Sequence, residues 1–165
     1  MRQLKVPATF MRGGTSNAIV FREKDLPEDR EIWSEIFIAA IGSPDPYGRQ
    51  LNGMGGGISS LSKVCVVGSP TRTDADIDYT FAQVAVREAK VEYGGNCGNM
   101  SAAMGPFAVD EGMVRVQGDQ AVVRIHNTNT SKIIEAHFKI DDHLAAVDGS
   151  YELPGVGGTG SALRL

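Results

Sequence analysis

The segment 98–111 constrains the fold more than any other part of the chain, because it leaves almost no charged face on a helix. Its apolar residues are Met100, Ala102, Ala103, Met104, Phe107, Ala108 and Val109. A helix that is apolar on all sides is stable only when nearly all of it is buried. Pro106 within it predicts a kink or a break. We therefore expect strands curled around one central helix.

One further helix is predicted in the first third of the chain. Asp25 is a suitable capping residue, Pro27 follows early, and apolar residues at helical spacing run from Ile32 to Ala40. Gly42 is expected to end this helix. Its single apolar stripe predicts packing on the outside of a sheet.

Alternating apolar residues predict strands along most of the remaining chain. The expected ranges are 63–69, 77–86, 88–93, 113–117, 120–127, 131–140 and 145–153. The alternation changes parity within 77–86, which predicts a bulge, and residues 127–131 are typical of a hairpin turn. The predicted fold class is α+β, with mostly antiparallel strands around one buried helix and one outer helix.

A polar turn, G-G-N-C-G-N at residues 94–99, opens directly into the apolar segment. Free backbone N–H groups and the helix dipole favour an anion at such a helix start. The same field favours the thiolate form of a cysteine, so Cys97 is a candidate acid, base or nucleophile. The alternative is a structural turn in which the cysteine is incidental.

Two other segments are rich in glycine and hydroxyl groups. Residues 11–16 read M-R-G-G-T-S between two strand-like stretches, which predicts a tight turn. Residues 42–62 contain many glycines and serines and lead to Lys63. A loop of this kind buries little apolar area, so we expect either that a ligand orders it or that it is a flexible surface loop.

Taken in order along the chain, these motifs resemble a known family. M-R-G-G-T-S, then G-S-P-D-P-Y-G with N-G-M-G-G, then S-K-V and G-G-N-C-G-N-M-S are similar to the family of the methylaconitate, methylitaconate and oxalomesaconate isomerases. The resemblance implies the fold of diaminopimelate epimerase and proline racemase. It also implies that residues 1–165 are a single domain, equivalent to the N-terminal half of a two-domain protein whose second domain is absent here.

The function that the resemblance implies is a cofactor-independent isomerase of small unsaturated di- and tricarboxylic acids. Such an enzyme moves a proton and, with it, a carbon–carbon double bond. The family's catalytic lysine and cysteine fall at Lys63 and Cys97. The residues implied for binding the substrate carboxylates are Arg12, Thr15, Ser16, Ser60, Asn96, Gly98 and Asn99.

The residue types agree with this chemistry. Removing a proton beside a carboxylate-substituted alkene requires a base, an acid and donors directed at the developing charge. The sequence leaves open whether Lys63 or Cys97 removes the proton. It also leaves open a simpler role for Lys63 as an anchor for a substrate carboxylate.

The resemblance also bears on partners, because two domains enclose the site in that family while this sequence stops at Leu165. If the chain is complete, activity would require a homodimer or a separate chain that supplies the second domain. The competing hypothesis is a half-domain that binds carboxylates, or pairs with another chain, without catalysis. Amino-acid epimerisation is disfavoured, since no acidic residue stands beside the N-C-G-N turn to bind an ammonium group.

Composition and charge argue against several other classes of protein. The net charge of −4 argues against non-specific binding to nucleic acid. No apolar run approaches the roughly 18 residues of a membrane span, and no signal-peptide pattern is evident, so a cytoplasmic protein is expected.

The cysteines and histidines predict neither a disulfide nor a metal site. Cys65 lies in an apolar strand and Cys97 in a polar turn, so no disulfide is expected. The spacing of His126, His137 and His143 does not match a zinc site, and no metal is predicted. His126 and His137 are expected to have surface or cross-strand roles.

Overall fold

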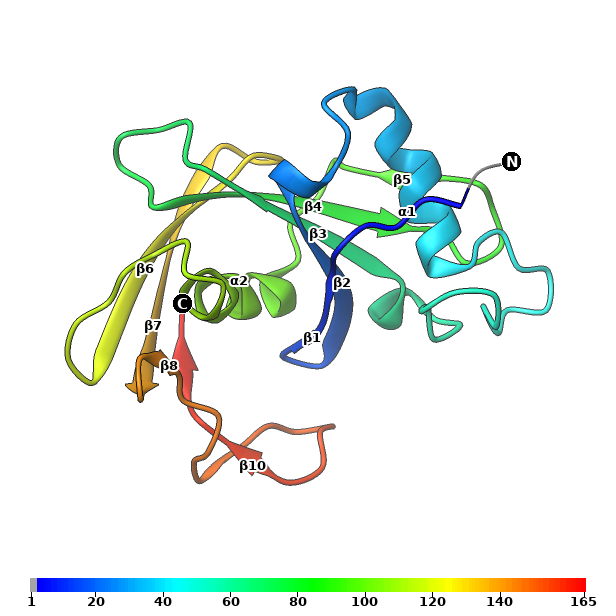
Figure 1. The fold of residues 1–165 in the computed structure, drawn as a ribbon. Coiled ribbons are helices and arrows are strands. Elements are labelled where there is room, and N and C mark those ends of the chain that lie inside the picture. Colours follow the sequence, from blue (N-terminus) through cyan, green and yellow to red (C-terminus); the bar gives the residue numbers. More distant parts are fainter. Residues whose placement is uncertain (1–2) are drawn as a thin grey trace.

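The computed structural model describes residues 3–165 and shows a curved sheet wrapped around one helix (Figure 1). Within these residues, nine strands form the main sheet in the spatial order β1-β2-β3-β4-β6-β7-β11, with β5 beside β4 and β8 beside β7. The bounds are β1 Thr9–Gly13, β2 Ser16–Arg22, β3 Lys63–Gly68, β4 Ile77–Val84, β5 Val91–Glu92, β6 Gln120–Asn127, β7 Lys132–Asp141, β8 Leu144–Ala145 and β11 Leu163–Arg164. A separate ribbon pairs β9 (Tyr151–Glu152) with β10 (Thr159–Gly160). The predicted α+β class is confirmed.

The two α-helices connect parallel neighbours in a sheet that is otherwise antiparallel. The pairs β2–β3 and β4–β6 are parallel. Parallel neighbours require a crossover connection, which is usually a helix. Here α1 (Trp33–Ile41) lies between β2 and β3 in the chain, and α2 (Gly98–Asp110) lies between β4 and β6. They pack on opposite faces of the sheet, which gives one central and one outer helix as predicted.

Helix α2 forms the main core inside the curl of the sheet. Its buried residues are Met100, Ser101, Ala103, Met104, Gly105, Phe107, Ala108 and Val109. A Cβ atom at Gly105 would lie 2.9 Å from side-chain atoms of Ala136 and Phe138, so glycine lets the helix approach β7 closely. The helix continues through Pro106, so of the two predicted outcomes, a kink or a break, the break does not occur. Pro106 has no N–H to donate to the carbonyl of Ala102, four residues earlier in the helix. Both residues line an open groove, where this carbonyl can reach water.

Helix α1 packs on the outer face but begins later than predicted. The chain from residue 23 to residue 32 forms two short 3₁₀ turns, η1 (Glu23–Asp25) and η2 (Arg30–Ile32), and α1 begins only at Trp33. The carboxylate of Asp29 accepts a hydrogen bond from the backbone of Glu31 at 2.9 Å, which caps η2. The indole of Trp33 donates to the carbonyl of Pro27 at 2.8 Å, which holds the preceding segment as a turn. Gly42 ends the helix with φ of 83°, as expected.

The central strands β3 and β4 are buried on both faces, and this explains the parity change along β4. Ile77, Tyr79 and Phe81 pack towards α2, whereas Ala82 and Val84 pack towards α1. The pairing of β3 with β4 runs without interruption from Lys63 opposite Gln83 to Gly68 opposite Asp78. The predicted bulge is therefore wrong, because apolar residues on both faces imitate a shift in alternation.

Three other strand predictions are wrong in extent. Only β5 forms within 88–93, and 145–153 contains the last residue of β8 and the short strand β9 instead of one long strand. Residues 113–117 form no strand, because the backbone N–H groups of Met113 and Val114 bond to the carbonyl of Ala108 and close the end of α2. The hairpin turn between β6 and β7 is confirmed, with Asn127 paired to Lys132.

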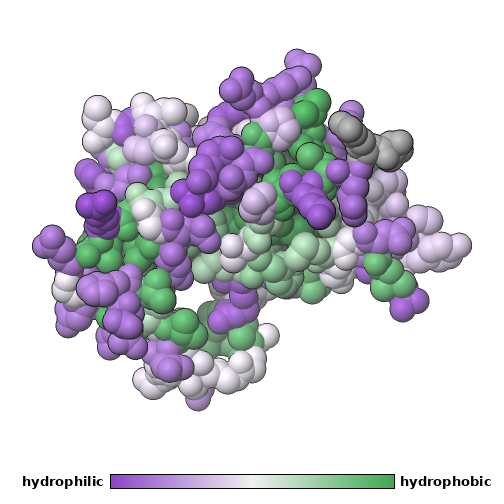
Figure 2. Space-filling view, in the orientation of Figure 1, coloured by the Kyte–Doolittle hydropathy of each residue, from purple (hydrophilic) through white to green (hydrophobic). Residues whose placement is uncertain are grey.

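Before the chain returns to the sheet at β11, the segment with the β9–β10 ribbon stands apart from the curled sheet and leaves a hollow, which is visible in Figure 2 above that ribbon. The walls of this groove come from the β1–β2 hairpin, from α2 and from residues 151–163. Hydrophilic side chains cover much of the visible face (Figure 2). Among residues 3–165, no helix is both long enough and apolar enough to cross a membrane.

Candidate active site

The N-terminal hairpin turn and the start of α2 pack directly against each other. The side-chain nitrogen of Asn99 donates to Thr15 Oγ1 at 3.0 Å and to Ser16 Oγ at 3.3 Å. Gly13 and Gly14 lie so close to Asn99 that a Cβ atom at either glycine would collide with it. The two motifs are thus joined, although they are far apart in the sequence.

Cys97 is the residue that precedes the first turn of α2. Its backbone is extended, with φ of −112° and ψ of 101°, and its half-buried side chain packs against the core around α2. Its carbonyl accepts hydrogen bonds from the backbone N–H of Ser101 at 2.9 Å and from Ser101 Oγ at 3.0 Å. The first N–H groups of a helix have no partner within the helix, so this end of α2 can receive an anion.

The neighbouring Asn96 fixes the turn that carries the thiol. Asn96 Oδ1 accepts a hydrogen bond from the side-chain nitrogen of Asn127 at 2.9 Å and lies 3.2 Å from Ser101 Oγ. Asn127 is fully buried at the end of β6. Gly98 is exposed, and a Cβ atom there would meet nothing within 4 Å. The turn is therefore anchored on its inner side and open on its outer side.

Lys63 is buried at the first position of β3, with 8% of its surface exposed. Its Nζ donates to Oε1 of Gln83 at 2.6 Å and lies 5.3 Å from the centre of the Phe81 ring. Gln83 is also the cross-strand partner of Lys63 in the sheet. Because β2 and β3 are parallel, their first residues meet at the same end of the sheet, which places Lys63 near Ser16.

Cys65 is a buried cysteine on the same strand as Lys63. It lies two residues after Lys63 on the same face of β3, and its thiol is fully buried. Burial raises the pKa of Cys65, and a hydrogen bond with Tyr79 lowers it; the charge of Cys97 raises it further, while the charge of Lys63 lowers it. Lys63 and Cys97 both lie on the α2 side of the sheet, since Lys63 shares the face of Cys65 and Cys97 packs against the core around α2. Cys65 itself is a free core cysteine, as predicted.

The remaining predicted residues differ in how closely they join this arrangement. Thr15, Ser16 and Asn99 form one hydrogen-bonded group. The exposed Arg12 donates to the carbonyl of Gly14 at 2.8 Å, within its own turn. Ser60 is half-buried in the short 3₁₀ turn η3 (Ser59–Leu61), three residues before Lys63.

An open groove beside the Cys97 turn contains residues that the sequence did not single out. Its lining residues are Phe81, Gln83, Glu92, Tyr93, Gly94 and Gly95. Gln83 contacts Lys63, and this contact depends on the register between β3 and β4. The only available signal was the position of Gln83 at the polar end of an apolar strand, and that position does not identify its partner.

The glycine-rich loop is ordered by its own polar side chains. The side chain of Gln50 is buried, and its Oε1 accepts a hydrogen bond from the backbone of Gly57 and contacts Ser62 Oγ, both at 2.8 Å. Asp45 accepts from the backbone of Tyr47 at 2.9 Å. These contacts hold the loop together from within, and whether a ligand orders it further stays a prediction. Ser62 directly precedes Lys63, so the loop also fixes the start of β3.

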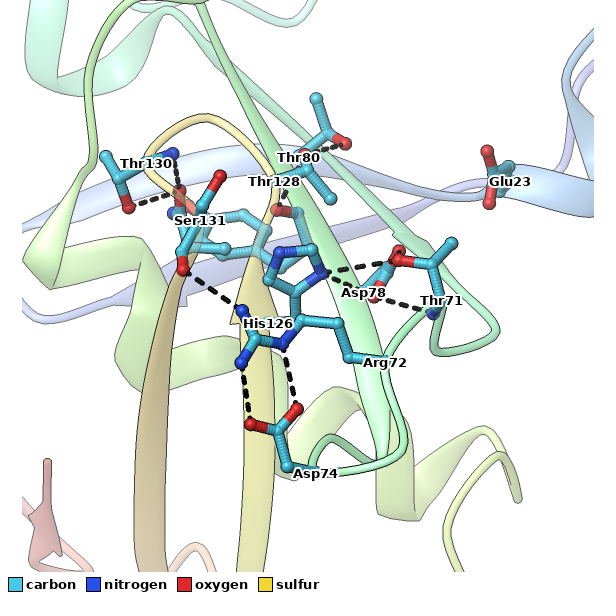
Figure 3. Close-up of polar contacts among 12 residues, drawn as sticks. Glu23, Thr71, Arg72, Asp74, Asp78, Thr80, His126, Thr128, Thr130 and Ser131 are labelled. Atoms are coloured by element: carbon cyan, nitrogen blue, oxygen red, sulfur yellow. Dashed lines mark hydrogen bonds and ion pairs between the residues drawn. The ribbon is translucent and has the colours of Figure 1, made fainter.

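A second polar cluster lies at the opposite end of β3 and β4 (Figure 3). Asp78 Oδ1 is 2.9 Å from Nδ1 of its cross-strand partner His126, and Thr71 Oγ1 donates to Asp78 Oδ2 at 2.7 Å. Arg72 forms an ion pair with Asp74 beside it. The predicted cross-strand role of His126 is confirmed. Among residues 3–165, no group of three or more metal-ligating side chains comes together.

The curved sheet around one central helix is the fold of the proline racemases and related epimerases. A probable proline racemase from Agrobacterium radiobacter superposes with a TM-score of 0.55 at 11% identity, over 90% of this chain and 46% of that one, which shows the fold alone. The family model described as PrpF protein matches residues 3–165. The chain belongs to the PrpF family.

Similar proteins within that family carry isomerase names. The 3-methylitaconate isomerase of Eubacterium barkeri is 44% identical over 95% of this chain, and the 2-methyl-aconitate isomerase of Cupriavidus necator is 43% identical over 93%. The crystal structure of a methylitaconate-delta-isomerase superposes with a TM-score of 0.90 at 44% identity, over 94% of this chain and 40% of that one. The chain spans less than half the length of these relatives, 41% of each of the two curated proteins.

Proposed function

We propose that this chain is the N-terminal, Lys63- and Cys97-bearing domain of a cofactor-independent isomerase of small unsaturated di- and tricarboxylic acids. The observation that carries the proposal is that Lys63 and Cys97, 34 positions apart by their numbers, both lie on the α2 side of the sheet, where Lys63 stands over the ring of Phe81 and Cys97 packs against the same core. The isomerase names of the PrpF relatives give the reaction class.

The reaction needs two proton carriers and no electron transfer. One of the two residues takes a proton from the carbon next to the double bond, which forms an extended enolate. The other residue returns a proton to the far carbon of the allylic system, and the double bond moves with the change. Atoms and charge balance, since one group gains the proton that the other loses. Lys63 and Cys97 are suited to the two roles because one is buried beside neutral groups and the other stands at a helix start.

The substrate carboxylates require donors close to both groups. The first turn of α2, with Asn96, Gly98 and Asn99, offers backbone and amide N–H groups beside Cys97. Arg12, Thr15, Ser16 and Ser60 are proposed to complete the binding surface from the neighbouring turns. The arginine supplies the positive charge that favours a di- or tricarboxylate over a monocarboxylate.

A complete cleft is proposed to need more than this one domain. The relatives are more than twice as long as the matched region, and the outer side of the Cys97 turn is open. The missing wall would come from further residues of a longer chain, from a second copy of this domain, or from a separate chain. A cytoplasmic location stays a prediction from the sequence.

The second candidate function is carboxylate binding without catalysis. The open Cys97 turn favours it, because an enolate is protected only in a site that excludes water. A binder would hold the same acids at the same residues but would not exchange their protons.

Proton exchange followed by NMR separates the two candidates. The purified chain is incubated with trans-aconitate and its methyl-substituted relatives in deuterated water, in parallel with Cys97→Ser and with Cys65→Ala as a matched control for loss of a thiol. Deuterium incorporation that disappears in Cys97→Ser and persists in folded Cys65→Ala supports the isomerase. Shifts of substrate resonances without exchange support the binder and overturn catalysis by this chain.

A further inference from the structure

We propose that Gln83 is the positioning residue for Lys63, and that its amide holds the lysine amine in the site without neutralising it. This inference rests on the proposed function for its catalytic meaning. Its structural basis is the 2.6 Å contact between Lys63 Nζ and Gln83 Oε1, made between directly opposed residues of β3 and β4. The sequence motifs assign no role to this glutamine.

The orientation of the Gln83 amide is fixed by the backbone around it. Its side-chain nitrogen donates to the carbonyls of Ser59 and Ser62, each at 3.0 Å. Only the nitrogen of an amide can donate, so these two carbonyls direct Oε1 towards the lysine. The glycine-rich loop thus positions Lys63 in two ways. It fixes the start of β3 through Ser62, and its carbonyls orient the amide of Gln83.

The lysine has no carboxylate partner among the residues that the structure describes. Its neighbours are the neutral amide of Gln83 and the ring of Phe81. The closest acidic residue in register is Glu92, which pairs with Gln83 across β4 and β5. The carboxylate of Glu92 instead forms an ion pair with Lys90 at 2.6 Å. The positive charge of Lys63 is therefore left for an anionic ligand.

A neutral partner matters because an acidic one would interfere both with proton transfer by Lys63 and with its binding of a substrate carboxylate. A carboxylate at this position would hold the proton on the amine, and it would also compete with the carboxylate of a substrate. An apolar side chain would leave the amine without a hydrogen bond in a mostly buried place. Glutamine avoids both outcomes, and Gln83 lines a groove together with Gly94 and Gly95 of the turn that carries Cys97.

The test compares Gln83→Glu and Gln83→Met with a control elsewhere in the sheet. Gln120 and Lys139 are also directly opposed in an antiparallel pair, but both are exposed on β6 and β7. Gln120→Glu therefore creates the same glutamate–lysine pair far from the site. Circular dichroism and thermal unfolding show that each variant is folded before any other measurement.

The first measurement does not depend on activity. Reductive methylation of the purified chain over a range of pH, followed by peptide mass spectrometry, measures the reactivity of Lys63. Gln83→Glu is expected to slow its labelling about tenfold and Gln83→Met to speed it, since the unprotonated, accessible amine is the reactive form. Gln120→Glu should leave the labelling rate of Lys63 unchanged. It should change the labelling rate of Lys139 less than about fivefold, as expected for an exposed ion pair.

The second measurement is the pH dependence of deuterium exchange into trans-aconitate. Gln83→Glu should lower kcat about tenfold or more and move the profile by about one pH unit, while a purely structural role would leave the profile in place. Equal Lys63 labelling in the parent chain and both folded Gln83 variants would overturn the inference. A parent chain that shows no exchange would contradict the proposed function alone, because the labelling result still decides whether Gln83 holds Lys63.

Discussion

Asn99 donates a hydrogen bond of 3.0 Å from its side-chain nitrogen to Thr15 Oγ1, across 84 positions of the sequence. The bond ties the start of the central helix to the turn between the first two strands. Ser16, at the beginning of β2, shares the same donor at 3.3 Å. The geometry around Cys97 therefore depends on the N-terminal hairpin as much as on α2.

Gly13→Ala is expected to separate these two elements. A Cβ atom at this position would collide with the carbonyl of Asn99, a backbone atom that cannot rotate away. We expect a loss of about 1–3 kcal/mol in the free energy of unfolding, measured by urea denaturation. Gly157→Ala is the matched control, because a Cβ atom there meets nothing within 4 Å. Equal stability of the two variants would show that the turns are not tightly packed.

Asp45→Asn is expected to destabilise the glycine-rich loop in a pH-dependent way. Backbone N–H groups of Tyr47 and Gln50 bond to the carboxylate and hold the pKa of Asp45 below its usual value. Since the folded pKa is below the unfolded one, the stabilisation is present above the unfolded value of about 4 and is lost as the pH falls through the folded pKa.

The difference in Tm between the parent chain and Asp45→Asn should therefore be larger at pH 7 than at pH 3. Asp119→Asn provides a control at an exposed aspartate. A difference that is the same at both pH values would mean that the charge of Asp45 does not stabilise the loop.

The parts of the structure that could be predicted from the sequence are those that depend on local patterns. The all-round apolar segment predicted a buried α2, and the hairpin turn at 127–131 follows from its composition. The start of α1 could not be predicted, because the bond from Trp33 to Pro27 competes with helix formation. The apparent bulge in β4 reflects burial on both faces, which a pattern in one strand does not reveal.

In the candidate site, too, local patterns could be predicted from the sequence and tertiary contacts could not. The motifs around Lys63 and Cys97 supplied the candidate catalytic residues, and their roles stay a prediction. The partners of these residues could not be found in the same way. Gln83 faces Lys63 only because of the register of β3 and β4, and Gln50 orders its loop from a buried position that no periodic pattern marks.

The two cysteines are expected to differ sharply in reactivity. The thiol of Cys65 is fully buried, and burial raises its pKa, so it remains a protonated thiol near neutral pH. Cys97 is half-buried at the open turn. Iodoacetamide at pH 8, followed by peptide mass spectrometry, should modify Cys97 alone in the folded chain and both cysteines in urea. Modification of Cys65 at a comparable rate in the folded chain would show that the core opens readily.

Asn127→Ala is expected to alter the reactivity of Cys97 from the opposite side of the turn. Asn127 donates to Asn96 Oδ1 at 2.9 Å, and its own Oδ1 accepts from Thr130 Oγ1 and the Thr130 backbone at 3.0 Å each. Loss of this buried side chain should cost about 1–3 kcal/mol and release Asn96.

The rate at which iodoacetamide modifies Cys97 separates the two contacts of Asn127, one with Asn96 and one with Thr130. Thr130→Val removes one bond in the hairpin turn and leaves the contact with Asn96 in place. We expect Asn127→Ala to change the alkylation rate of Cys97 several-fold, since the turn loses its inner anchor, and Thr130→Val to leave the rate at the parent value. If both variants changed the rate equally, the β6–β7 hairpin as a whole, and not the bond to Asn96, would be what holds the Cys97 turn in place.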